Sequence, residues 1–587
     1  MNNTLPSLIK RLWAHIDRRR KINFFILIII MLLASIAEVI SIGAVIPFLG
    51  VMTTPETIIN LPYLQPILLY LEISSQSDLL ILFTLIFIVA AIFSGAMRLT
   101  LLWFQTRLSH SVGASIGIEI YRRTLFQPYS LHISRNSSEI IAGITQKTNV
   151  VVDLVLIPIF TIFSSLLILS SILIALISID PLIAIFSFLG FGFIYLSVIL
   201  ITQSGLSRDG KRISVERNKI MKSLQEGLGG IRDVLLSGSQ KIYVNIFKKS
   251  EIPFRRATAR ITIVSMSPRY AIESLGMILI AIMAYTLADR AEGISSAIPI
   301  LGAFALGAQR LLPVLQQAYG GWQTIRGGQA QFKDAIELLE QPLPSYLLDE
   351  DIKSVDFERH IKLKNIKFKY LSNNKYVIDD ISLTIDKGSR VGFIGSTGCG
   401  KSTLLDIIMG LIEPTEGKFL IDNNEIDFQN NRGWQKHIAH VPQAIFLSDS
   451  SIAENIAFGV PKNEIDYDRL ELSAKQAQLT DLIESWDGKY DSHVGERGVR
   501  ISGGQRQRIG IARALYQNAD VIIFDEATSA LDNETEQAII ESITELSKNL
   551  TIIMVAHRLT TLEGCSIIYQ LKDGKIQRSG SFDEIVN

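Results

Sequence analysis

The sequence has almost no cysteine. Only Cys399 and Cys565 occur among 587 residues, and both fall in the second half of the chain. Two cysteines cannot build a disulfide framework, which argues against a small secreted domain and indicates a reducing compartment. A chain of this length exceeds what one hydrophobic core organises, so at least two domains are expected.

An overall surplus of charge is also absent, since 57 Lys and Arg stand against 57 Asp and Glu. The two halves nevertheless differ. Residues 1–342 hold 30 basic and 20 acidic side chains, whereas the remainder holds 27 and 37. Membrane topology and anionic lipid headgroups account for the basic segments, so no nucleic-acid partner is predicted.

Long apolar runs are confined to the first half of the chain. A bilayer core requires about 20 predominantly apolar residues per helix, and six runs meet that length. We therefore predict a transmembrane domain over 1–342, a linker over 343–354 and a soluble domain over 355–587. The six predicted spans are residues 22–50, 79–104, 151–178, 182–202, 263–288 and 294–320.

The distribution of basic residues predicts the topology. Residues 11–21 and the 203–262 loop are rich in Lys and Arg, whereas residues 51–78 contain neither. The positive-inside rule then predicts a multi-pass protein of the inner (cytoplasmic) membrane, with its N-terminus and its soluble domain in the cytoplasm. The external segment 51–78 is apolar, with interfacial Tyr63 and Tyr70, and suits either the membrane surface or a loop packed on helix ends.

A glycine-rich loop follows a short strand at 390–394 and precedes a helix that begins near Ser402. Glycines let backbone N–H groups turn toward phosphate oxygens, Lys401 reaches the terminal phosphates, and the Ser402 hydroxyl can ligate Mg²⁺. The loop predicts a nucleotide-phosphate site. Its residues are Gly395, Ser396, Thr397, Gly398, Cys399, Gly400, Lys401, Ser402 and Thr403.

Two carboxylates end the continuous apolar strand at 521–524. Asp525 is placed to hold Mg²⁺, and Glu526 is placed to orient or deprotonate an attacking water. His557 follows the apolar strand 551–555 and could contact the γ-phosphate. The alternative is a structural carboxylate pair capping the strand, which the position of His557 makes less favourable. These residues predict hydrolysis of a nucleoside triphosphate.

A second anion-binding element is predicted at residues 502–505. Gly503 and Gly504 directly precede a predicted helix over 505–516, whose N-terminus favours negative charge. The four residues are Ser502, Gly503, Gly504 and Gln505. Within one soluble domain a single nucleotide cannot easily use both this site and the phosphate loop.

The order and spacing of the phosphate loop, residues 501–505 and Asp525-Glu526 resemble the ATP-binding cassette. With the apolar half before it, the chain resembles an ABC exporter half-transporter. The resemblance implies an all-α six-helix transmembrane domain of the type IV exporter kind, followed by an α/β P-loop nucleotide-binding domain. It also implies an ATPase that uses ATP and Mg²⁺ to drive transport.

The resemblance assigns further roles. Tyr370 would stack on adenine, Gln443 would reach the metal and the water, and Asp532 would belong to the loop at the dimer interface. Residues 501–505 match the family's signature segment. Its first residue is Ile501 where the family usually has Leu, a near-isosteric change that should be tolerated. The signature of one cassette closes on the ATP of its partner, so a homodimer is implied. Coupling helices are implied near 127–130 and 229–232.

Three arginines lie within predicted spans, where each charge costs roughly 2.5 to 3.5 kcal/mol on insertion scales. Arg98, Arg269 and Arg310 would suit phosphate or pyrophosphate oxygens if they face a shared cavity. The alternative pairs Arg98 with Glu38 and another arginine with Glu273. Because three arginines outnumber two glutamates, the count favours a ligand.

These arginines and the apolar external segment also resemble the lipid-linked oligosaccharide flippases. That narrower resemblance implies export of an amphipathic saccharide lipid, with a polyprenyl-pyrophosphate carrier. A lipid or drug exporter of broad specificity is the main alternative, and an ATP-gated channel or regulator is a further one. A peptide exporter is disfavoured because no N-terminal protease domain precedes the first span.

Overall fold

The computed structural model describes most of the chain. The described residues are 4–53, 70, 76–134, 144, 147–179, 181–288, 294–343, 355–370, 375–428, 431–495, 498–526, 534–539, 550–556 and 559–586. Most of the predicted external segment 51–78 and of the predicted linker 343–354 lies outside them.

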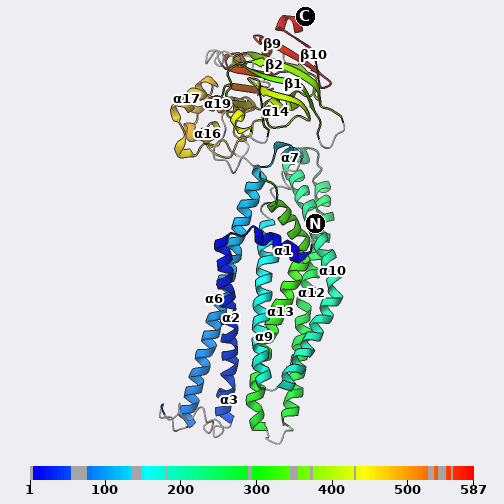
Figure 1. The fold of residues 1–587 in the computed structure, drawn as a ribbon, viewed down its shortest axis with the longest axis vertical. Helices are drawn as coiled ribbons and strands as arrows, with labels where there is room; N and C mark the ends of the chain where they lie inside the picture. Colours follow the sequence, from blue (N-terminus) through cyan, green and yellow to red (C-terminus); the bar gives the residue numbers. More distant parts are fainter. Residues whose placement is uncertain are drawn as a thin grey trace. The chain divides into compact units, whose positions relative to one another are not determined.

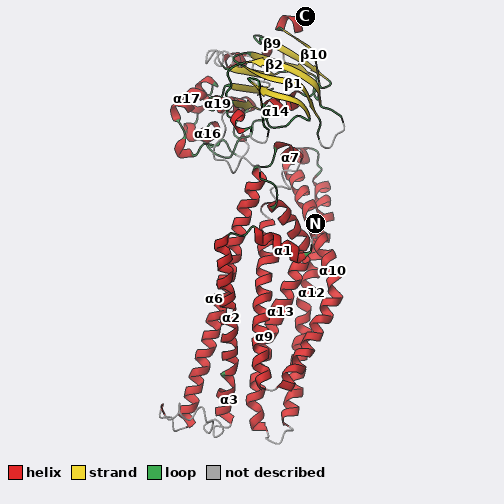
Figure 2. Cartoon of the chain, viewed as in Figure 1, coloured by secondary structure: helices red, strands yellow, loops and turns green. Residues whose placement is uncertain are grey.

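Two compact units make up the chain. One comprises Met1–Gln127 and Arg135–Pro342, and the other comprises Pro128–Ser134 and Leu343–Asn587. Figure 2 shows that the first is built of helices and that the second holds all the strands in view. A helical half followed by an α/β half is therefore confirmed.

Long helices form the first unit and run side by side (Figure 1). α2 lies against α6 and α9, and α13 lies against α9, α10 and α12. The helices are α1 (Leu5–Ala14), α2 (Arg18–Gly43), α3 (Val45–Thr53), α6 (Gln76–Leu125), the π-helix η1 (Val152–Leu156), α9 (Ile157–Ile179), α10 (Pro181–Gly229), α11 (Ile231–Leu236), α12 (Gln240–Ala288) and α13 (Ile294–Leu339).

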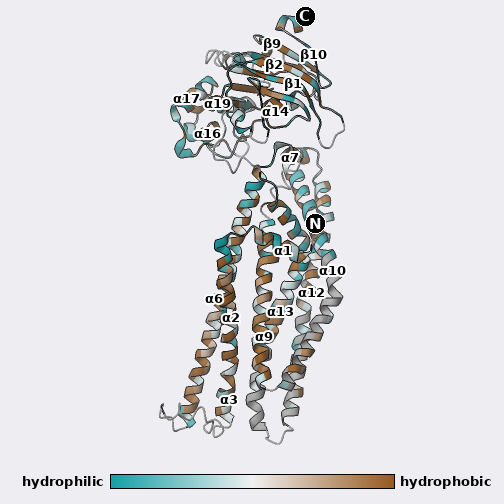
Figure 3. Ribbon diagram, viewed as in Figure 1, coloured by the Kyte–Doolittle hydropathy of each residue, from teal (hydrophilic) through white to brown (hydrophobic). Residues whose placement is uncertain are grey.

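Apolar side chains dominate α2 and α9 along much of their length (Figure 3). Within the described residues, three helical stretches are long and apolar enough to cross a bilayer: Arg18–Thr53, Gln76–Leu125 and Lys147–Ser178. They contain the first three predicted spans. The other three predicted spans fall within α10, α12 and α13.

Several helices continue well past the predicted spans. α6 extends to Leu125 and α10 to Gly229, beyond the predicted ends at 104 and 202. A short helix follows each breaker sequence: α7 (Tyr129–Ser134) after Pro128 and α11 after Gly230. These are the positions where the family resemblance implies coupling helices, and α7 belongs to the second unit.

Two sheets form the second unit. One has the antiparallel order β2-β1-β4-β5, and the other has the order β10-β9-β3-β8-β7-β6, in which the ladders from β9 to β6 are parallel. The strands are β1 (His360–Phe368), β2 (Ile378–Asp386), β3 (Arg390–Gly395), β4 (Glu416–Ile421), β5 (Asn424–Glu425), β6 (Ile438–Val441), β7 (Val521–Asp525), β8 (Thr551–Val555), β9 (Ile567–Lys572) and β10 (Lys575–Gly580).

The burial of these strands follows their sequence patterns. β7 and β8 are continuous apolar runs and are buried along their apolar residues, as central parallel strands require. β1 alternates apolar and charged residues, and largely alternates buried and more exposed positions. The helices around the sheets are α14 (Lys401–Ile408), α15 (Arg432–Gln435), α16 (Ile452–Ile456), α17 (Tyr467–Gln476), α18 (Thr480–Glu484), α19 (Gly503–Tyr516) and α21 (Phe582–Val586).

Candidate functional site

The phosphate loop joins β3 to α14, which is the predicted strand-loop-helix context. Gly400 is the N-cap of α14 and has a φ of 105°, in the left-handed region that favours glycine. A Cβ there would lie 2.9 Å from the carbonyl oxygen of Val377, so a larger residue would also clash. The Lys401 ammonium donates to the carbonyl oxygens of Gly395 and Ser396, at 2.8 and 3.1 Å. A bound phosphate would compete for this ammonium.

Cys399 is buried within the same loop, and its Sγ atom lies 3.9 Å from the Lys401 Nζ atom. Its role in the sequence-based site is only to occupy a loop position. The loop also includes Ser396, Thr397 and Gly398. Gly398 has a positive φ, of 82°.

Oxygen ligands for a divalent cation come together at the end of β7. The Ser402 hydroxyl hydrogen-bonds the Asp525 carboxylate, and burial together with the neighbouring Glu526 raises the pKa of Asp525. A hydroxyl and a carboxylate fit Mg²⁺, which is commonly held by one or two protein oxygens and the substrate phosphates. Bound Mg²⁺ would supply charge neutralisation at the phosphates, and Ser402 and Asp525 would hold it.

A third carboxylate, which sequence reasoning missed, lies near this pair. Asp406 is on α14 and its pKa is raised to about 6, first by burial and then by the charge of Asp525. Its only sequence signal is its place on the helix that follows the phosphate loop.

Glu526 directly follows β7 and has an unusual backbone. Its φ is 53°, which is rare outside glycine and asparagine, and its N–H donates to the carbonyl oxygen of Val555 at 3.0 Å. The Gln443 amide donates to the Glu526 carboxylate at 2.7 Å. The structure thus brings together two residues that lie far apart in the sequence, at a strained position of the kind found in active sites.

Tyr370 follows β1 and packs edge-on against Phe368, with ring centroids 4.9 Å apart. Its hydroxyl lies 3.1 Å from the Thr403 hydroxyl, next to the phosphate loop. Tyr129 on α7 is close enough to Asp406 and Tyr370 that both raise its pKa, after the larger effect of burial. This neighbour was missed as a site residue, although its segment was expected to hold a coupling helix.

The signature segment starts α19 two residues earlier than predicted, at Gly503 rather than Gln505. Ser502 is the N-cap, and its hydroxyl accepts from the Gln505 N–H while the Gln505 side chain accepts from the Ser502 N–H. This capping box leaves the N–H groups of Gly503 and Gly504 at the first turn, where a helix offers no internal acceptor. The prediction of a helix start was right, but the glycines are inside the helix.

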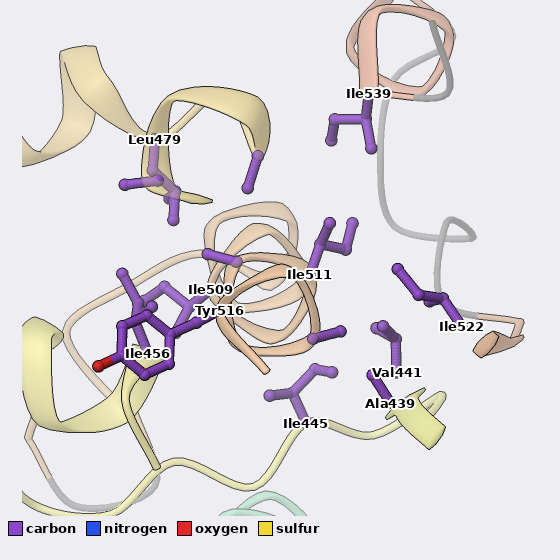
Figure 4. Packing of buried hydrophobic residues seen from close by; sticks show 14 of the residues in the cluster. Ala439, Val441, Ile445, Ile456, Leu479, Ile509, Ile511, Tyr516, Ile522 and Ile539 are labelled. Atoms are coloured by element: carbon purple, nitrogen blue, oxygen red, sulfur yellow. The ribbon is translucent and has the colours of Figure 1, made fainter. Parts of the chain in front are cut away.

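Packing around α19 fixes the orientation of this helix start. Figure 4 shows Ile509, Ile511 and Tyr516 on α19 among side chains from β6, β7 and the neighbouring helices. Ile509 and Ile511 are fully buried. The hydrophobic core therefore fixes the position of α19 and of the signature segment at its start. The residues of the segment itself only cap the helix.

Two predicted site residues, His557 and Asp532, lie outside the described part of the chain. Their assigned roles remain predictions.

The predicted ligand arginines take a different arrangement in the first unit. Arg98 on α6 and Arg310 on α13 both form ion pairs with Glu38 on α2. Glu38 is completely buried, and it also accepts from the Ser94 hydroxyl at 3.1 Å. The excess of arginines over glutamates had favoured arginines that are free to bind a ligand. Both of these arginines are instead paired with Glu38.

The alternative prediction, an ion pair between Arg98 and Glu38, is therefore found for Arg98. The second arginine, Arg310, also pairs with Glu38. Arg310 also donates to the Ser41 hydroxyl at 3.0 Å and to the Ser94 hydroxyl at 3.2 Å. The serines were missed because isolated serines in apolar runs carry no specific signal. Arg269 lies on α12, but its side chain is outside the described part.

Comparison with known families gives two matches. The family described as "ABC transporter" matches residues 378–529, and the one described as "ABC transporter transmembrane region" matches residues 21–296. Together they match part of each unit.

Individual relatives are similar over different lengths. The "ATP-dependent lipid A-core flippase" of Pseudomonas savastanoi pv. phaseolicola is 27% identical over 97% of this chain and 92% of its own. The flippase of that name from Pseudomonas aeruginosa is 37% identical, over 45% of this chain and 43% of its own. The "Heterocyst differentiation ATP-binding protein HepA" of Nostoc sp. is 30% identical over 66% and 64%.

A solved structure of "a bacterial Atm1-family ABC exporter with ATP bound" matches the whole fold. The TM-score is 0.77, with 21% sequence identity, over 97% of this chain and 96% of the other. At this identity the similarity concerns the fold alone. It places the helices of the first unit and the sheets of the second in one known architecture.

Proposed function

Since this chain belongs to the ABC transporters and has their exporter fold, we propose that two copies of it flip an amphipathic saccharide lipid across the inner membrane. ATP is the energy source, and Mg²⁺ is held by Ser402 and Asp525. The finer proposal for the cargo is a polyprenyl-pyrophosphate-linked oligosaccharide. The N-terminus and the cassette would be cytoplasmic, as the distribution of basic residues predicts.

The observation that carries the cargo proposal is the cluster of Glu38, Arg98 and Arg310. One carboxylate and two guanidinium groups leave a net charge of about +1 within helices that carry predicted spans. The Arg98 side chain is 45% exposed although its Nε atom pairs with Glu38, and we assign the rest of its guanidinium to an anionic oxygen of the cargo. Relatives named lipid A-core flippases support a saccharide-lipid cargo in general.

The chemistry of the cassette follows from its own residues. Glu526 would orient the attacking water and accept its proton, while the Gln443 amide holds the carboxylate in place. Lys401 and the loop N–H groups would stabilise the developing phosphate charge. The first turn of α19, with Gly503 and Gly504, would close on the nucleotide of the partner cassette, so hydrolysis would require two chains.

The direct test is lipid translocation by purified protein in liposomes. The panel comprises a polyprenyl-pyrophosphate saccharide, a lipid A-type saccharide lipid, a phospholipid and unrelated hydrophobic drugs. Arg98→Ala and Arg310→Ala should each lower the number of saccharide lipids flipped per ATP hydrolysed by roughly tenfold, since each loses a charge-assisted contact.

Arg107→Ala is the matched control. Arg107 is also on α6, but its guanidinium stacks on the Trp103 ring at 5.0 Å and is not part of the Glu38 cluster. Equal flipping by all three variants would contradict the headgroup proposal. Transport of the drugs alone would favour the broad-specificity exporter. ATP binding with neither ATP hydrolysis nor lipid transport would favour a channel or regulator.

A further inference from the structure

A cavity of about 590 Å³ lies between η1, α10, α12 and α13 in the first unit. This volume is in the usual range for a small-molecule site, about 300–1,000 Å³. The cavity is separate from the Glu38 cluster, none of whose residues line it. Its lining residues are Asn149, Val150, Asp153, Leu154, Ile213, Arg217, Phe254, Thr258, Ile261, Gln323, Thr324, Gly327, Gly328 and Gln331.

Gln323 gives the first indication of a ligand. Its side chain is buried, with 1% exposed, and its amide nitrogen donates to the Tyr319 hydroxyl at 2.6 Å and to the Val264 carbonyl oxygen at 3.3 Å. Its Oε1 atom finds no hydrogen-bond partner in the part of the chain that the structure describes. A buried amide oxygen without a donor is costly, so a donor supplied by a ligand would be favoured.

The threonines of the cavity also offer acceptors. The Thr258 hydroxyl donates to the Phe254 carbonyl oxygen at 3.0 Å, and the Thr324 hydroxyl donates to the Gly320 carbonyl oxygen at 2.8 Å. Each hydroxyl has one hydrogen and two lone pairs, so these two groups have only acceptor capacity left. A ligand rich in O–H or N–H donors is therefore favoured over phosphate, which only accepts.

The charges of the cavity point to a neutral ligand. Asp153 and Arg217 both line it, so an anion would meet the carboxylate and a cation would meet the guanidinium. The Phe254 ring also lines the cavity, with the Arg217 and Arg255 guanidinium groups 5.7 and 5.3 Å from its centre, and Leu154 and Ile261 add apolar surface. A sugar ring combines many hydroxyl donors, no charge and an apolar face.

The position of the cavity suits a lipid headgroup. Most of its residues lie beyond the predicted cytoplasmic ends of the spans 182–202, 263–288 and 294–320, and the others, residues 149–154, lie at the predicted cytoplasmic end of the span 151–178. Tyr319 and Trp322 stack with ring centroids 6.3 Å apart, and the Arg326 guanidinium lies over Trp322. Tyrosine and tryptophan gather at the level of headgroups in membrane proteins.

A π-helix forms one wall of the cavity. η1 spans Val152–Leu156 and contains the lining residues Asp153 and Leu154. Such segments are rare and occur frequently at functional sites, because the widened turn re-aims side chains. The irregular turn is thus found at the same place as the unpartnered acceptor.

From these observations we propose that the cavity is a binding site for the neutral sugar of the saccharide headgroup on the cytoplasmic side, distinct from the Glu38 cluster proposed for phosphate. This inference rests on the proposed function, which it deepens by dividing headgroup recognition between two sites. Gln323, Thr258 and Thr324 accept hydrogen bonds from the sugar, and Leu154 and Ile261 pack against its apolar face.

The test is equilibrium binding of two fluorescent lipids to the full-length protein in nanodiscs. Both lipids have the same polyprenyl chain and pyrophosphate, and only one bears an N-acetylated disaccharide. Wild type should bind the glycosylated lipid roughly tenfold more tightly, as two or three net hydrogen bonds would give.

Two different variants remove the preference in different ways. Thr258→Val/Thr324→Val removes two acceptors with little change of shape. Gly327→Leu fills the cavity: the nearest atom to a Cβ at Gly327 is the Ile261 Cδ1, at 3.8 Å, so the backbone accepts a side chain. Both variants should bind the two lipids about equally, and gel filtration shows whether each is folded. Thr262→Val is the matched control, since Thr262 is exposed, donates to the Thr258 carbonyl oxygen and is not among the lining residues.

The outcomes separate the two proposals. If wild type shows no preference for the sugar, or if the double-valine variant retains it, the sugar site is overturned while binding of lipid pyrophosphate stands. If neither lipid binds to wild type, both proposals fail. If Thr262→Val loses the preference as well, the effect belongs to α12 in general and the assignment to the cavity is overturned.

Discussion

At the scale of single residues, the cassette concentrates its chemistry in a few side chains at strand ends. Glu526 is held by a backbone with positive φ and by the Gln443 amide. The strained backbone and the hydrogen bond both restrict where the carboxylate can point. Such pre-positioning lowers the reorganisation needed when water attacks the phosphate.

Replacing Glu526 with Gln should lower ATP turnover by about 10²–10⁴-fold, because the amide cannot accept the proton of the attacking water. The measurement is steady-state phosphate release by the purified full-length protein. Glu416→Gln is the control, since Glu416 begins β4 in the other sheet and its carboxylate pairs with Lys367 on the surface. Turnover by Glu526→Gln within threefold of wild type would remove Glu526 from the proposed catalytic role.

Asp406 supports a prediction about pH. Because burial raises its pKa to about 6, the folded protein binds a proton more readily than the unfolded chain, whose Asp titrates near 3.8. Ionisation of Asp406 therefore destabilises the fold fully above pH 6, and this effect decreases as the pH falls and disappears below 3.8. Asp525 acts in the same direction.

Asp406→Asn should raise the free energy of unfolding at pH 7.5 by at most about 1 kcal/mol, after allowance for solvent screening of a partly exposed group. The gain should vanish below about pH 3, where Asp406 is neutral in both the folded and the unfolded state. Thermal unfolding of the full-length protein at both pH values measures the difference. A gain that is the same at both would show that ionisation of Asp406 is not its cause.

At the scale of elements, the N-termini of helices in the cassette have two different roles, helix capping and the proposed binding of nucleotide. Ser502 at α19 and Ser451 at α16 are both N-caps of a complete capping box. The local geometry is the same, yet only α19 carries glycines at its first two positions. The pair therefore separates the structural role of a cap from the role in nucleotide binding.

Ser502→Ala and Ser451→Ala should each destabilise the protein by about 1 kcal/mol, the usual cost of losing a cap. Ser502→Ala should in addition lower ATPase activity well beyond Ser451→Ala, because only the first removes a hydroxyl next to the proposed partner nucleotide. Thermal unfolding and ATPase rates of both variants are compared at one temperature below their transitions. Equal activity of the two would argue against a role of the signature segment in turnover.

At the scale of the whole molecule, the proposal requires two chains. A single chain has one phosphate loop and one signature segment, and the proposed site needs both from different copies. The consequence is a dependence of hydrolysis on assembly. Chains with Glu526→Gln should therefore interfere with wild-type chains in the same assembly.

Light scattering in detergent should give a mass of two chains. Mixing wild-type chains with excess Glu526→Gln chains before reconstitution should reduce transport in proportion to the fraction of mixed dimers. Each mixed dimer has only one competent site. Because transport is expected to require both sites, the loss should exceed what simple dilution gives. Lys462→Ala chains, altered at an exposed surface pair with Asp491, serve as the dilution control. A strictly monomeric protein with full ATPase activity would refute the dimer.

The sequence by itself determined the local features, because they depend on neighbours along the chain. Apolar runs gave the helices, continuous and alternating strands gave β7, β8 and β1, and the glycines, Lys401 and Ser402 gave the phosphate loop. The Ser402–Asp525 hydrogen bond and the Gln443–Glu526 hydrogen bond join residues whose proximity the family resemblance had implied.

Only the tertiary structure decided which distant groups meet. It placed Arg98 and Arg310 on the same buried Glu38, Asp406 beside Asp525, and Gln323 in a cavity between four helices. Helix rotation and packing settle such contacts, and no pattern within one segment records them. Burial then changes the chemistry, since removing water makes the pairing of each charged or polar group decisive for its free energy.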